Sequence, residues 1–346
     1  MVYKPFPIVA IVILNWNGQK FLEQFLPSVV NYSAGHLIYV VDNYSTDSSL
    51  LFLQENYPGV KIIQHQQNLG FCEGYNQGLR QIEADYYVLL NSDVEVTPNW
   101  LLPLITLMES DTTIAACQPK LKSFFQRNYF EYAGAGGGLL DHFGYPFCRG
   151  RLFNSLEKDE DQYNDSVPVF WATGACMFVR ATAYHQTGGL EPAFFAHMEE
   201  IDLCWRFQNK GYKVMYCGQS EVYHVGGGTL PSSNPRKTFL NFRNGLALLY
   251  KNFPTNGFYF ILFTRLILDW VASFKFLLSG QPADSLAVLK AHWAVWQNRS
   301  YWQEKRKEQT KQSDTHLQGW FKGSIVWSYF ILGKKTYRNL KLKRFN

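Results

Sequence analysis

The 346-residue sequence lacks the motifs of several common enzyme classes. Its first apolar run is followed by Asn15-Trp16-Asn17-Gly18 and carries no GxGxxG, so a dinucleotide-binding fingerprint is missing. A phosphate-binding loop that ends in Gly-Lys-Ser or Gly-Lys-Thr is absent, and so is a GxSxG nucleophile motif. These absences disfavour hydride transfer, ATP hydrolysis and ester hydrolysis.

Cysteine is sparse, and its spacing excludes the usual metal-binding motifs. None of the six cysteines stands in a CxxC pair or in a cluster with histidine. The first seven residues lead directly into an apolar run that is too short for a secretory signal. We therefore expect free thiols and a reducing, cytoplasmic compartment.

Long uncharged apolar runs are also missing. In the most apolar region, residues 257–278, the charged residues Arg265, Asp269 and Lys275 interrupt the pattern. The longest uncharged run there covers residues 252–264, fewer than the ~18 residues of a membrane-spanning helix. Arg265 and Asp269 are four residues apart and can pair on one helix face. We expect a helix that lies in the membrane interface or packs on the body; a membrane span is the alternative.

Charge is distributed unevenly along the chain. Residues 299–346 hold 12 Lys and Arg against 3 Asp and Glu, whereas the remainder holds 21 against 25. A basic, aromatic tail on a neutral-to-acidic body indicates contact with an anionic surface. Lipid headgroups are favoured, because no nucleic-acid recognition motif is present. The hydrophobic content of 47% predicts a packed core.

The first 120 residues alternate apolar runs with amphipathic stretches, which predicts an α/β fold. Strands are expected at residues 8–14, 37–41, 60–64 and 86–90, and helices at 18–31, 45–57 and 71–83, with Ser45 as an N-cap. Ligands of such sheets bind outside the carboxyl ends of the strands. Asn15, Asp42 and Asp93 fall at those ends.

The rest of the chain is organised differently. Residues 120–165 are rich in glycine, aromatic and acidic residues and predict a long, partly mobile loop over the site. Strand-like sequence returns at 167–180 and 213–216, with a helix at 199–210 in which Asp202 and Arg206 are expected to pair. We predict a globular domain over residues 1–254 and a C-terminal helical, basic, membrane-associating segment over residues 255–346.

Each polar residue taken alone has an ordinary structural explanation. Asp42 and Asp47 can cap the following helix, Asp93 can occupy a turn, and His224 can be a surface imidazole. Equally, a carboxylate at Asp42 can accept hydrogen bonds from a base N–H. A carboxylate at Asp93 can ligate Mg²⁺ or Mn²⁺ that bridges a diphosphate.

Taken in order, these segments resemble the family 2 glycosyltransferases of the GT-A fold over roughly residues 8–250. The resemblance lies in residues 12–18, 40–47, 68–71 with Asn76 and Gly78, 89–93, 174–177, 188–190 with Phe194-Phe195, 199–206, His224 with Gly226-Gly227, and Arg243-Asn244. Each segment is weak alone, but the ordered set is specific. It is most similar to the bacterial branch that contains the rhamnosyltransferases of surface-polysaccharide assembly.

The resemblance implies a Rossmann-like, mostly parallel sheet and an inverting transfer of a sugar from a UDP- or dTDP-sugar to a hydroxyl of a glycan or lipid-linked acceptor. It implies Mg²⁺ or Mn²⁺ as cofactor, with Asp93 and His224 as ligands. The implied base is Glu200, where the family usually has Asp, with Glu199 in reserve. From the free thiols and the basic tail we expect a cytoplasmic protein that is peripheral at the inner face of the plasma membrane. The implied nucleotide and donor contacts are Asn15, Asn17, Asp42, Asn68, Gly70, Phe71, Asn76, Ser92 and Arg243, although Arg243 can also form a surface salt bridge.

Three other functions were weighed against this one. A non-catalytic relative that binds glycan or lipid at the membrane is disfavoured by the presence of Asp93, Glu200 and His224. A sugar nucleotidyltransferase would carry a Gly-rich, Arg-containing loop after the first strand, which Asn15-Trp16-Asn17-Gly18 is not. A membrane-anchored scaffold accounts for the tail but for none of the preceding 200 residues.

Overall fold

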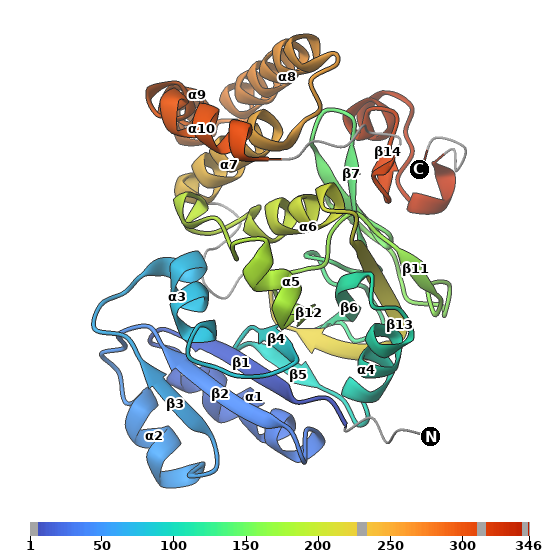
Figure 1. Cartoon of the computed structure of the whole chain (residues 1–346). Coiled ribbons are helices and arrows are strands. Elements are labelled where there is room, and N and C mark those ends of the chain that lie inside the picture. Colours follow the sequence, from blue (N-terminus) through green and yellow to red (C-terminus); the bar gives the residue numbers. More distant parts are fainter. Residues whose placement is uncertain (1–5, 227–233, 310–315, 341–344, 346) are drawn as a thin grey trace.

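The computed structural model describes residues 6–226, 234–309, 316–340 and 345 (Figure 1). A central mixed sheet with flanking helices occupies the lower part of Figure 1, and helices from the last third of the chain lie above it. A smaller sheet lies beside them near the C-terminus. The predicted α/β architecture is confirmed.

The first strands and helices alternate as expected. The strands are β1 (Val9–Asn15), β2 (Leu37–Asp42), β3 (Lys61–Gln64) and β4 (Tyr86–Leu90), and the helices are α1 (Gln19–Tyr32), α2 (Ser49–Asn56) and α3 (Gly70–Leu79). Strand β1 pairs in parallel with β2 and β4, and β2 pairs in parallel with β3. Ser45 is not the N-cap of α2, because α2 begins at Ser49 and the Ser45 hydroxyl accepts hydrogen bonds from Asn15 and Asn17.

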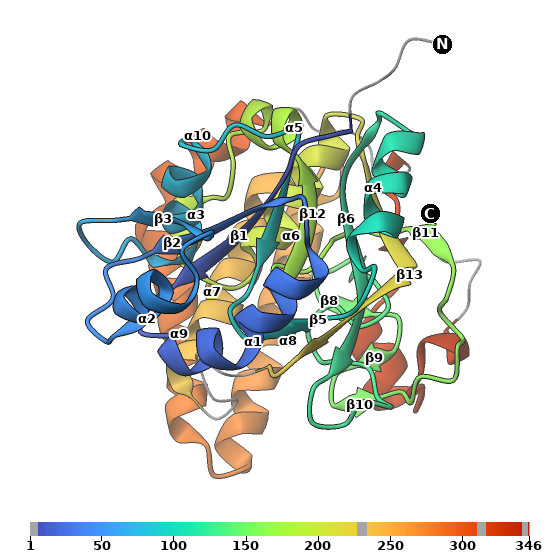
Figure 2. The same ribbon diagram turned by 90° about the horizontal axis from the view of Figure 1, so that it is seen from below.

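The apolar strands bury both faces. In β1, Val9, Ile11 and Ile13 join one core cluster while Ala10 and Val12 join the other. Successive side chains of a strand point to opposite faces, so a strand covered on both sides is apolar throughout. Figure 2 shows α1 and α2 beside these strands, and α3 packs on the face that holds Ala10 and Val12.

The second half of the central sheet contains antiparallel strands. The strands of this half are β5 (Val94–Val96), β6 (Ile114–Ser123), β11 (Ser166–Pro168), β12 (Cys176–Arg180) and β13 (Lys213–His224). The helices between them are α4 (Leu101–Ser110), α5 (Ala181–Gln186), η1 (Pro192–Phe194) and α6 (Glu199–Asn209). The strand order is β11-β13-β6-β12-β4-β1-β2-β3, and β5 pairs with β13. Because β12 runs antiparallel to β4 and β6, the expected mostly parallel sheet is parallel only from β4 to β3 and between β6 and β13.

Residues 120–165 do not form one long loop, and their mobility stays a prediction. They contain β7 (Gly138–Asp141), β8 (Pro146–Cys148), β9 (Arg151–Leu152) and β10 (Ser155–Leu156), which form a second sheet with β14 (Trp320–Phe321). Phe147 and Phe321 pack in the core of this sheet. Strand β14, which completes this sheet, lies far away in the sequence. A local sequence pattern therefore cannot predict the pairing.

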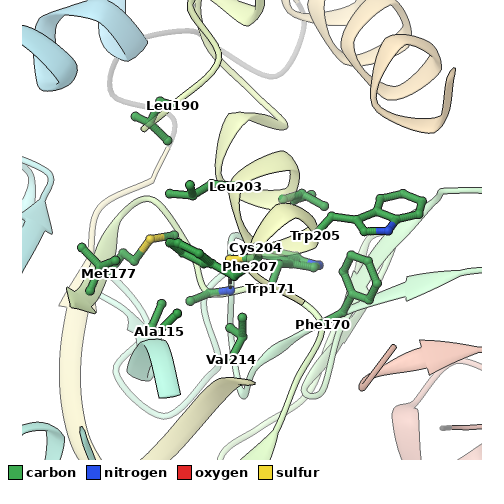
Figure 3. Packing of buried hydrophobic residues seen from close by; sticks show 14 of the residues in the cluster. Ala115, Phe170, Trp171, Met177, Leu190, Leu203, Cys204, Trp205, Phe207 and Val214 are labelled. Carbon is green, nitrogen blue, oxygen red and sulfur yellow. Dashed lines mark hydrogen bonds between the residues drawn. The ribbon is translucent and has the colours of Figure 1, made fainter. Parts of the chain in front are cut away.

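Helix α6 is held in the interior by apolar packing and by buried charges. In Figure 3, side chains of α6 such as Leu203 and Phe207 pack against residues of neighbouring strands. On another side of the helix Arg206 Nε lies 2.8 Å from Asp202 Oδ2, which confirms the predicted pair. Lys251 from α7 (Pro235–Asn252) donates to the same carboxylate at 3.0 Å. Because α6 begins with Glu199 and Glu200, these contacts also fix the position of both carboxylates.

The C-terminal part consists mainly of helices. They are α8 (Phe258–Leu278), α9 (Pro282–Gln297), α10 (Arg299–Glu308), η3 (Trp327–Ile331) and η4 (Tyr337–Asn339). Arg265 and Asp269 of α8 pair at 2.8 Å, as predicted, and Arg265 also donates to the Gly144 carbonyl beside the second sheet. None of the helices in the described part of the chain combines the length and apolar character that a membrane crossing needs.

Candidate functional site

Three predicted residues meet where the parallel strands end. In the parallel register Asn15 of β1 lies opposite Asp42 of β2, and β4 leads directly into Asn91-Ser92-Asp93. A Cβ atom placed on Gly18 would lie 2.5 Å from Asn15 Oδ1 and 3.7 Å from Ser92 Oγ. Asn15, Asp42 and Ser92 therefore belong to one edge of the sheet, and a glycine is needed where they converge.

Asp42 is held rigidly inside this edge. Its two carboxylate oxygens accept hydrogen bonds from Asn15 Nδ2 at 3.2 Å and from the Ser45 amide at 3.0 Å, and its side chain is fully buried. Asn17 supports the same turn, because its Oδ1 accepts the Thr46 amide at 2.7 Å. By contrast, the buried Asn15 Oδ1 has no protein partner. Asn15 thus offers the free acceptor, and Asp42 orients it.

A second loop lies next to this edge. Asn43, which we had not assigned to the site, donates to Asn68 Oδ1 at 3.0 Å and accepts the Leu69 amide at 3.0 Å. Gly70 has φ +73°, and a Cβ atom there would lie 2.8 Å from the Phe195 ring. Only glycine combines that conformation with that close approach. The loop is therefore clamped between the end of β2 and the segment that precedes α6.

Asn76 has no hydrogen-bonding capacity left for a ligand. Its Nδ2 donates to the Leu190 carbonyl and to Glu73, and its Oδ1 accepts the Leu190 amide and the Tyr184 hydroxyl. A side-chain amide has two donors and two acceptor positions, and all four are used. Asn76 therefore stabilises the turn before η1 and does not belong to the donor pocket.

Asp93 and His224 face each other across the β5–β13 pair. Strand β13 ends at His224, which lies opposite Val94, and His224 Nε2 is 3.2 Å from Asp93 Oδ1. On the other side of the ring, Nδ1 is 3.5 Å from Glu131 Oε2. Burial lowers the pKa of His224, but the Glu131 charge and the bond to Asp93 outweigh it and raise the pKa to about 10. Sequence reasoning missed Glu131, a lone carboxylate outside any motif.

These residues suit a divalent cation that is bound together with a diphosphate. No three His, Cys, Asp or Glu side chains of the described residues form a metal cluster by themselves. Mg²⁺ is usually held by one or two carboxylates plus substrate phosphates. Asp93 Oδ1 and His224 Nε2 lie 3.2 Å apart as an ion pair, and the two side chains would hold a cation once His224 gives up its proton. A carboxylate behind a histidine ligand, as Glu131 is here, orients the ring.

Glu199 and Glu200 begin α6 and lie next to Phe71. A Cβ atom on Gly174 would lie 3.7 Å from Phe71 Cζ, 3.8 Å from Glu199 Oε1 and 3.9 Å from Glu200 Cβ. Glu199 is buried, Glu200 is partly exposed, and the Oε2 atom of each has no protein partner. Burial raises the pKa of Glu200 to about 7, and burial together with the Glu200 charge holds the pKa of Glu199 well above its usual range. Glu200 is therefore the better base near neutral pH.

The two acidic groups are connected through the segment around Gly174. The Asn91 amide donates to the Ala175 carbonyl at 2.9 Å, so Asn91-Ser92-Asp93 runs beside the residue after Gly174. Residues 91–93, which end at Asp93, thus adjoin the Gly174–Ala175 stretch that also lies next to Glu199 and Glu200. Gly227, which belonged to the predicted His224 motif, lies outside the described residues.

The segment before Glu199 has an unusual backbone that Arg243 and Asn244 hold in place. Phe195, His197 and Met198 have φ values of 65°, 69° and 71°, which are costly for residues other than glycine. The buried Asn244 Nδ2 donates to the carbonyls of Phe194, Ala196 and His197 at 3.0, 2.8 and 2.7 Å. Arg243 donates to the carbonyls of Ala193 and Phe194. The predicted contact of Arg243 with the donor stays a prediction.

Replacement of Asn244 by alanine is expected to lower the free energy of unfolding by about 1–3 kcal/mol, because buried carbonyls lose their donor. Urea denaturation measures this difference. The control is Asn56→Ala, since Asn56 is exposed and donates to one carbonyl of its own helix. The control is expected to change stability by less than about 0.5 kcal/mol. If both variants were equally stable, Asn244 would not be what stabilises the segment before Glu199.

One family model matches the first half of the chain. The model described as glycosyl transferase family 2 matches residues 10–185. The chain belongs to this family. The match spans the edge formed by Asn15, Asp42 and Asp93, whereas Glu199, Glu200 and His224 lie beyond it.

Curated members of glycosyl transferase family 2 are similar over most of the chain. The N-acetylglucosaminyl-diphospho-decaprenol L-rhamnosyltransferase of Mycobacterium tuberculosis is 24% identical over 63% of this chain and 76% of its own. Rhamnosyltransferase WbbL of Escherichia coli is 25% identical over 63% of this chain and 83% of its own. The chain thus resembles the bacterial rhamnosyltransferases of the family.

Two solved structures share the fold at low sequence identity. GalNAc-T7, solved with UDP, GalNAc and Mn²⁺, superposes with a TM-score of 0.55 and 17% identity over 73% of this chain. The chain spans about half the length of that structure, 49%. The mannosyltransferase PcManGT of Pyrobaculum calidifontis, solved with GDP-mannose and Mn²⁺, gives a TM-score of 0.53 and 12% identity over 88% of this chain and 87% of its own. The GT-A fold is confirmed.

Proposed function

We propose that the chain is an inverting, metal-dependent glycosyltransferase that moves a hexosyl or rhamnosyl group from a UDP- or dTDP-sugar to a hydroxyl of a glycan or lipid-linked acceptor. The observation that carries the proposal is that two different acidic groups adjoin neighbouring segments of the chain: the Asn91 amide donates to the Ala175 carbonyl, and Gly174 lies next to Glu199 and Glu200. One is the Asp93–His224 pair, and the other is Glu199 with Glu200 at the start of α6. Such an arrangement serves leaving-group binding on one side and proton removal on the other.

Glu200 is the proposed general base. It is partly exposed, its Oε2 atom has no protein partner, and its pKa is raised to about 7 by burial. A base with a pKa near the working pH combines the deprotonated form with useful basicity. As the acceptor oxygen attacks the anomeric carbon, its proton passes to Glu200, and the bond from that carbon to the diphosphate oxygen breaks. One displacement of this kind inverts the anomeric configuration.

The diphosphate is proposed to bind beside Asp93 and His224, with Mg²⁺ or Mn²⁺ as the cation that these two side chains hold. A bound divalent cation acts as a Lewis acid on phosphoryl oxygens. Glu131 keeps the His224 ring in place. The nucleoside is proposed to lie along Asn15, Ser92 and the loop of Asn68, Gly70 and Phe71, with Asn17 and Asp42 shaping that edge.

The relatives support the classes of donor and acceptor. The Mycobacterium tuberculosis relative is named for N-acetylglucosaminyl-diphospho-decaprenol, which favours a lipid-linked acceptor. The two structural neighbours were solved with nucleotides and Mn²⁺, which favours a nucleotide sugar and a divalent cation. With an acceptor of this kind, the protein is proposed to act at the inner face of the plasma membrane as a peripheral protein.

A panel of nucleotide sugars tests the proposal. Thermal stabilisation of the full chain is measured with UDP-, dTDP- and GDP-sugars, each with Mn²⁺ and with a chelator. We expect a UDP- or dTDP-sugar to raise the melting temperature only when Mn²⁺ is present, because ligands that bind the native state stabilise it by mass action. Stabilisation by none of the sugars would favour the non-catalytic alternative.

A further inference from the structure

Helix α8 has one face that is apolar and exposed along its whole length. Nine large apolar side chains of α8, among them Phe263, Trp270 and Phe274, are between 43% and 83% exposed. At 3.6 residues per turn the nine fall within an arc of about 120°. The buried residues of the helix, including Arg265 and Asp269, lie on the opposite side. The exposed arc contains no charged residue.

The exposed face continues onto α9 and towards η3. On α9, Leu286, Leu289, Trp293 and Trp296 are between 50% and 56% exposed. Trp270 donates from α8 to His292 of α9 at 3.2 Å, which joins the two faces. At the other end of α8, Lys275 Nζ lies 4.8 Å from the ring centre of the exposed Phe330. We call the exposed sides of α8 and α9 the hairpin face; both helices lie at the upper edge of Figure 1, away from the strands β1–β3.

The charges beside the hairpin face are mainly basic. Lys275, Lys290 and Arg299 are exposed on or directly after its two helices. Residues 316–340, which include the exposed Phe330 near Lys275, hold three lysines and one arginine and no Asp or Glu. The acidic residues of α8 and α9 have partners, because Asp269 pairs with Arg265 and Asp284 accepts the Thr238 hydroxyl. Lys311, Lys341, Lys343 and Arg344 of the basic tail lie outside the described residues.

We infer that the hairpin face docks onto an anionic lipid bilayer, with its aromatic side chains in the interface and the surrounding Lys and Arg on the headgroups. Contiguous apolar patches of this extent mark interaction sites, whereas single exposed apolar residues do not. Tryptophan favours the headgroup level, and basic residues are attracted to anionic lipids. A second copy of the chain fits less well as the partner, because the basic residues around the two hairpin faces would then repel each other.

This inference rests on the proposed function, since it names the surface by which the protein would bind the membrane. It also connects that surface to the candidate site. Helix α7 packs against α8, α9 and α6, and its residue Asn244 holds the segment before Glu199. The bilayer would therefore be attached through one helix to the segment that carries the proposed base. A lipid-linked acceptor in that bilayer would be held close to the enzyme.

The test uses the full chain and co-sedimentation with vesicles of phosphatidylglycerol and phosphatidylcholine in equal parts, or of phosphatidylcholine alone. We expect binding to the anionic vesicles that weakens in high salt. The double variant Phe263→Glu with Phe274→Glu is expected to lose about 100-fold in affinity, because two exposed side chains no longer enter the interface. The matched control, Leu51→Glu with Leu102→Glu, changes two exposed apolar residues elsewhere and is expected to bind like the wild type.

Two outcomes would overturn the inference. One is the same affinity of the wild type and the Phe263/Phe274 variant for the anionic vesicles, or no binding by either. The other is a dimer of the wild type in size-exclusion chromatography that the variant abolishes without any vesicle binding, which would assign the hairpin face to a second copy. Binding of UDP with Mn²⁺ is measured on the same samples, so a failure of the docking surface is distinguished from a failure of the transferase.

Discussion

The variant Glu200→Gln is expected to lower kcat by about 10²–10⁴-fold, the range typical for loss of a general base. Glutamine keeps the shape of the side chain at the start of α6 but cannot take the acceptor proton. Donor affinity is expected to change little, because the substitution leaves in place the Asp93–His224 pair and every side chain assigned to the nucleoside. Steady-state kinetics gives kcat, and titration calorimetry with UDP and Mn²⁺ gives the affinity.

Glu199→Gln is the matched control for this variant. Burial and the Glu200 charge hold the pKa of Glu199 well above its usual range, which disfavours the carboxylate form that a general base needs. We therefore expect a small effect on kcat. Full turnover by Glu200→Gln together with an inactive Glu199→Gln would assign the base to Glu199.

The dependence of kcat/KM on pH is expected to identify the same base. A base acts as its carboxylate, and the carboxylate fraction falls as the pH drops below the pKa of Glu200, about 7. In the wild type kcat/KM should therefore rise with pH up to about 7 and then level off. In Glu200→Gln this acid limb should be absent. An acid limb of the same shape in both proteins would exclude Glu200 as its source.

Asp93→Ala is expected to remove the gain in UDP affinity that Mn²⁺ provides. Loss of a residue behind a metal ligand already costs about 10–100-fold in metal affinity, so loss of a ligand should cost at least about 100-fold. Calorimetry with UDP, in the presence of Mn²⁺ or of a chelator, measures the difference. In the variant the two conditions should give the same weak affinity.

Glu95→Ala is the control for Asp93→Ala, because it also removes a carboxylate close to Asp93. Glu95 lies two residues after Asp93 in β5, but it pairs with Arg127 at the surface. We expect its UDP affinity with Mn²⁺ to equal that of the wild type. If Asp93→Ala kept the full Mn²⁺-dependent gain, Asp93 would not be a metal ligand, and the proposed place of the diphosphate would have to be abandoned.

Local patterns were sufficient for the first half of the fold. The strands β1 to β4 and the helices between them were predicted within a few residues, because strands buried on both faces are apolar throughout and turn residues separate them. The pairs Asp202–Arg206 and Arg265–Asp269 were also predictable, since residues four apart in a helix are neighbours. Ser45 was misassigned because its partners, Asn15 and Asn17, come from another strand end.

The sequence by itself thus determined the α/β class and placed Asn15, Asp42 and Asp93 at strand ends. It also contained the ordered motifs by which the family is recognised. Only the tertiary structure decided that residues 138–156 form a sheet with Trp320 and Phe321, that Glu131 lies behind His224, and that Asn244 holds the turn before Glu199. The physical reason is distance along the chain: periodicity and turn propensity act over a few residues, whereas these contacts join segments about 50 to 180 residues apart and form only once the chain has folded.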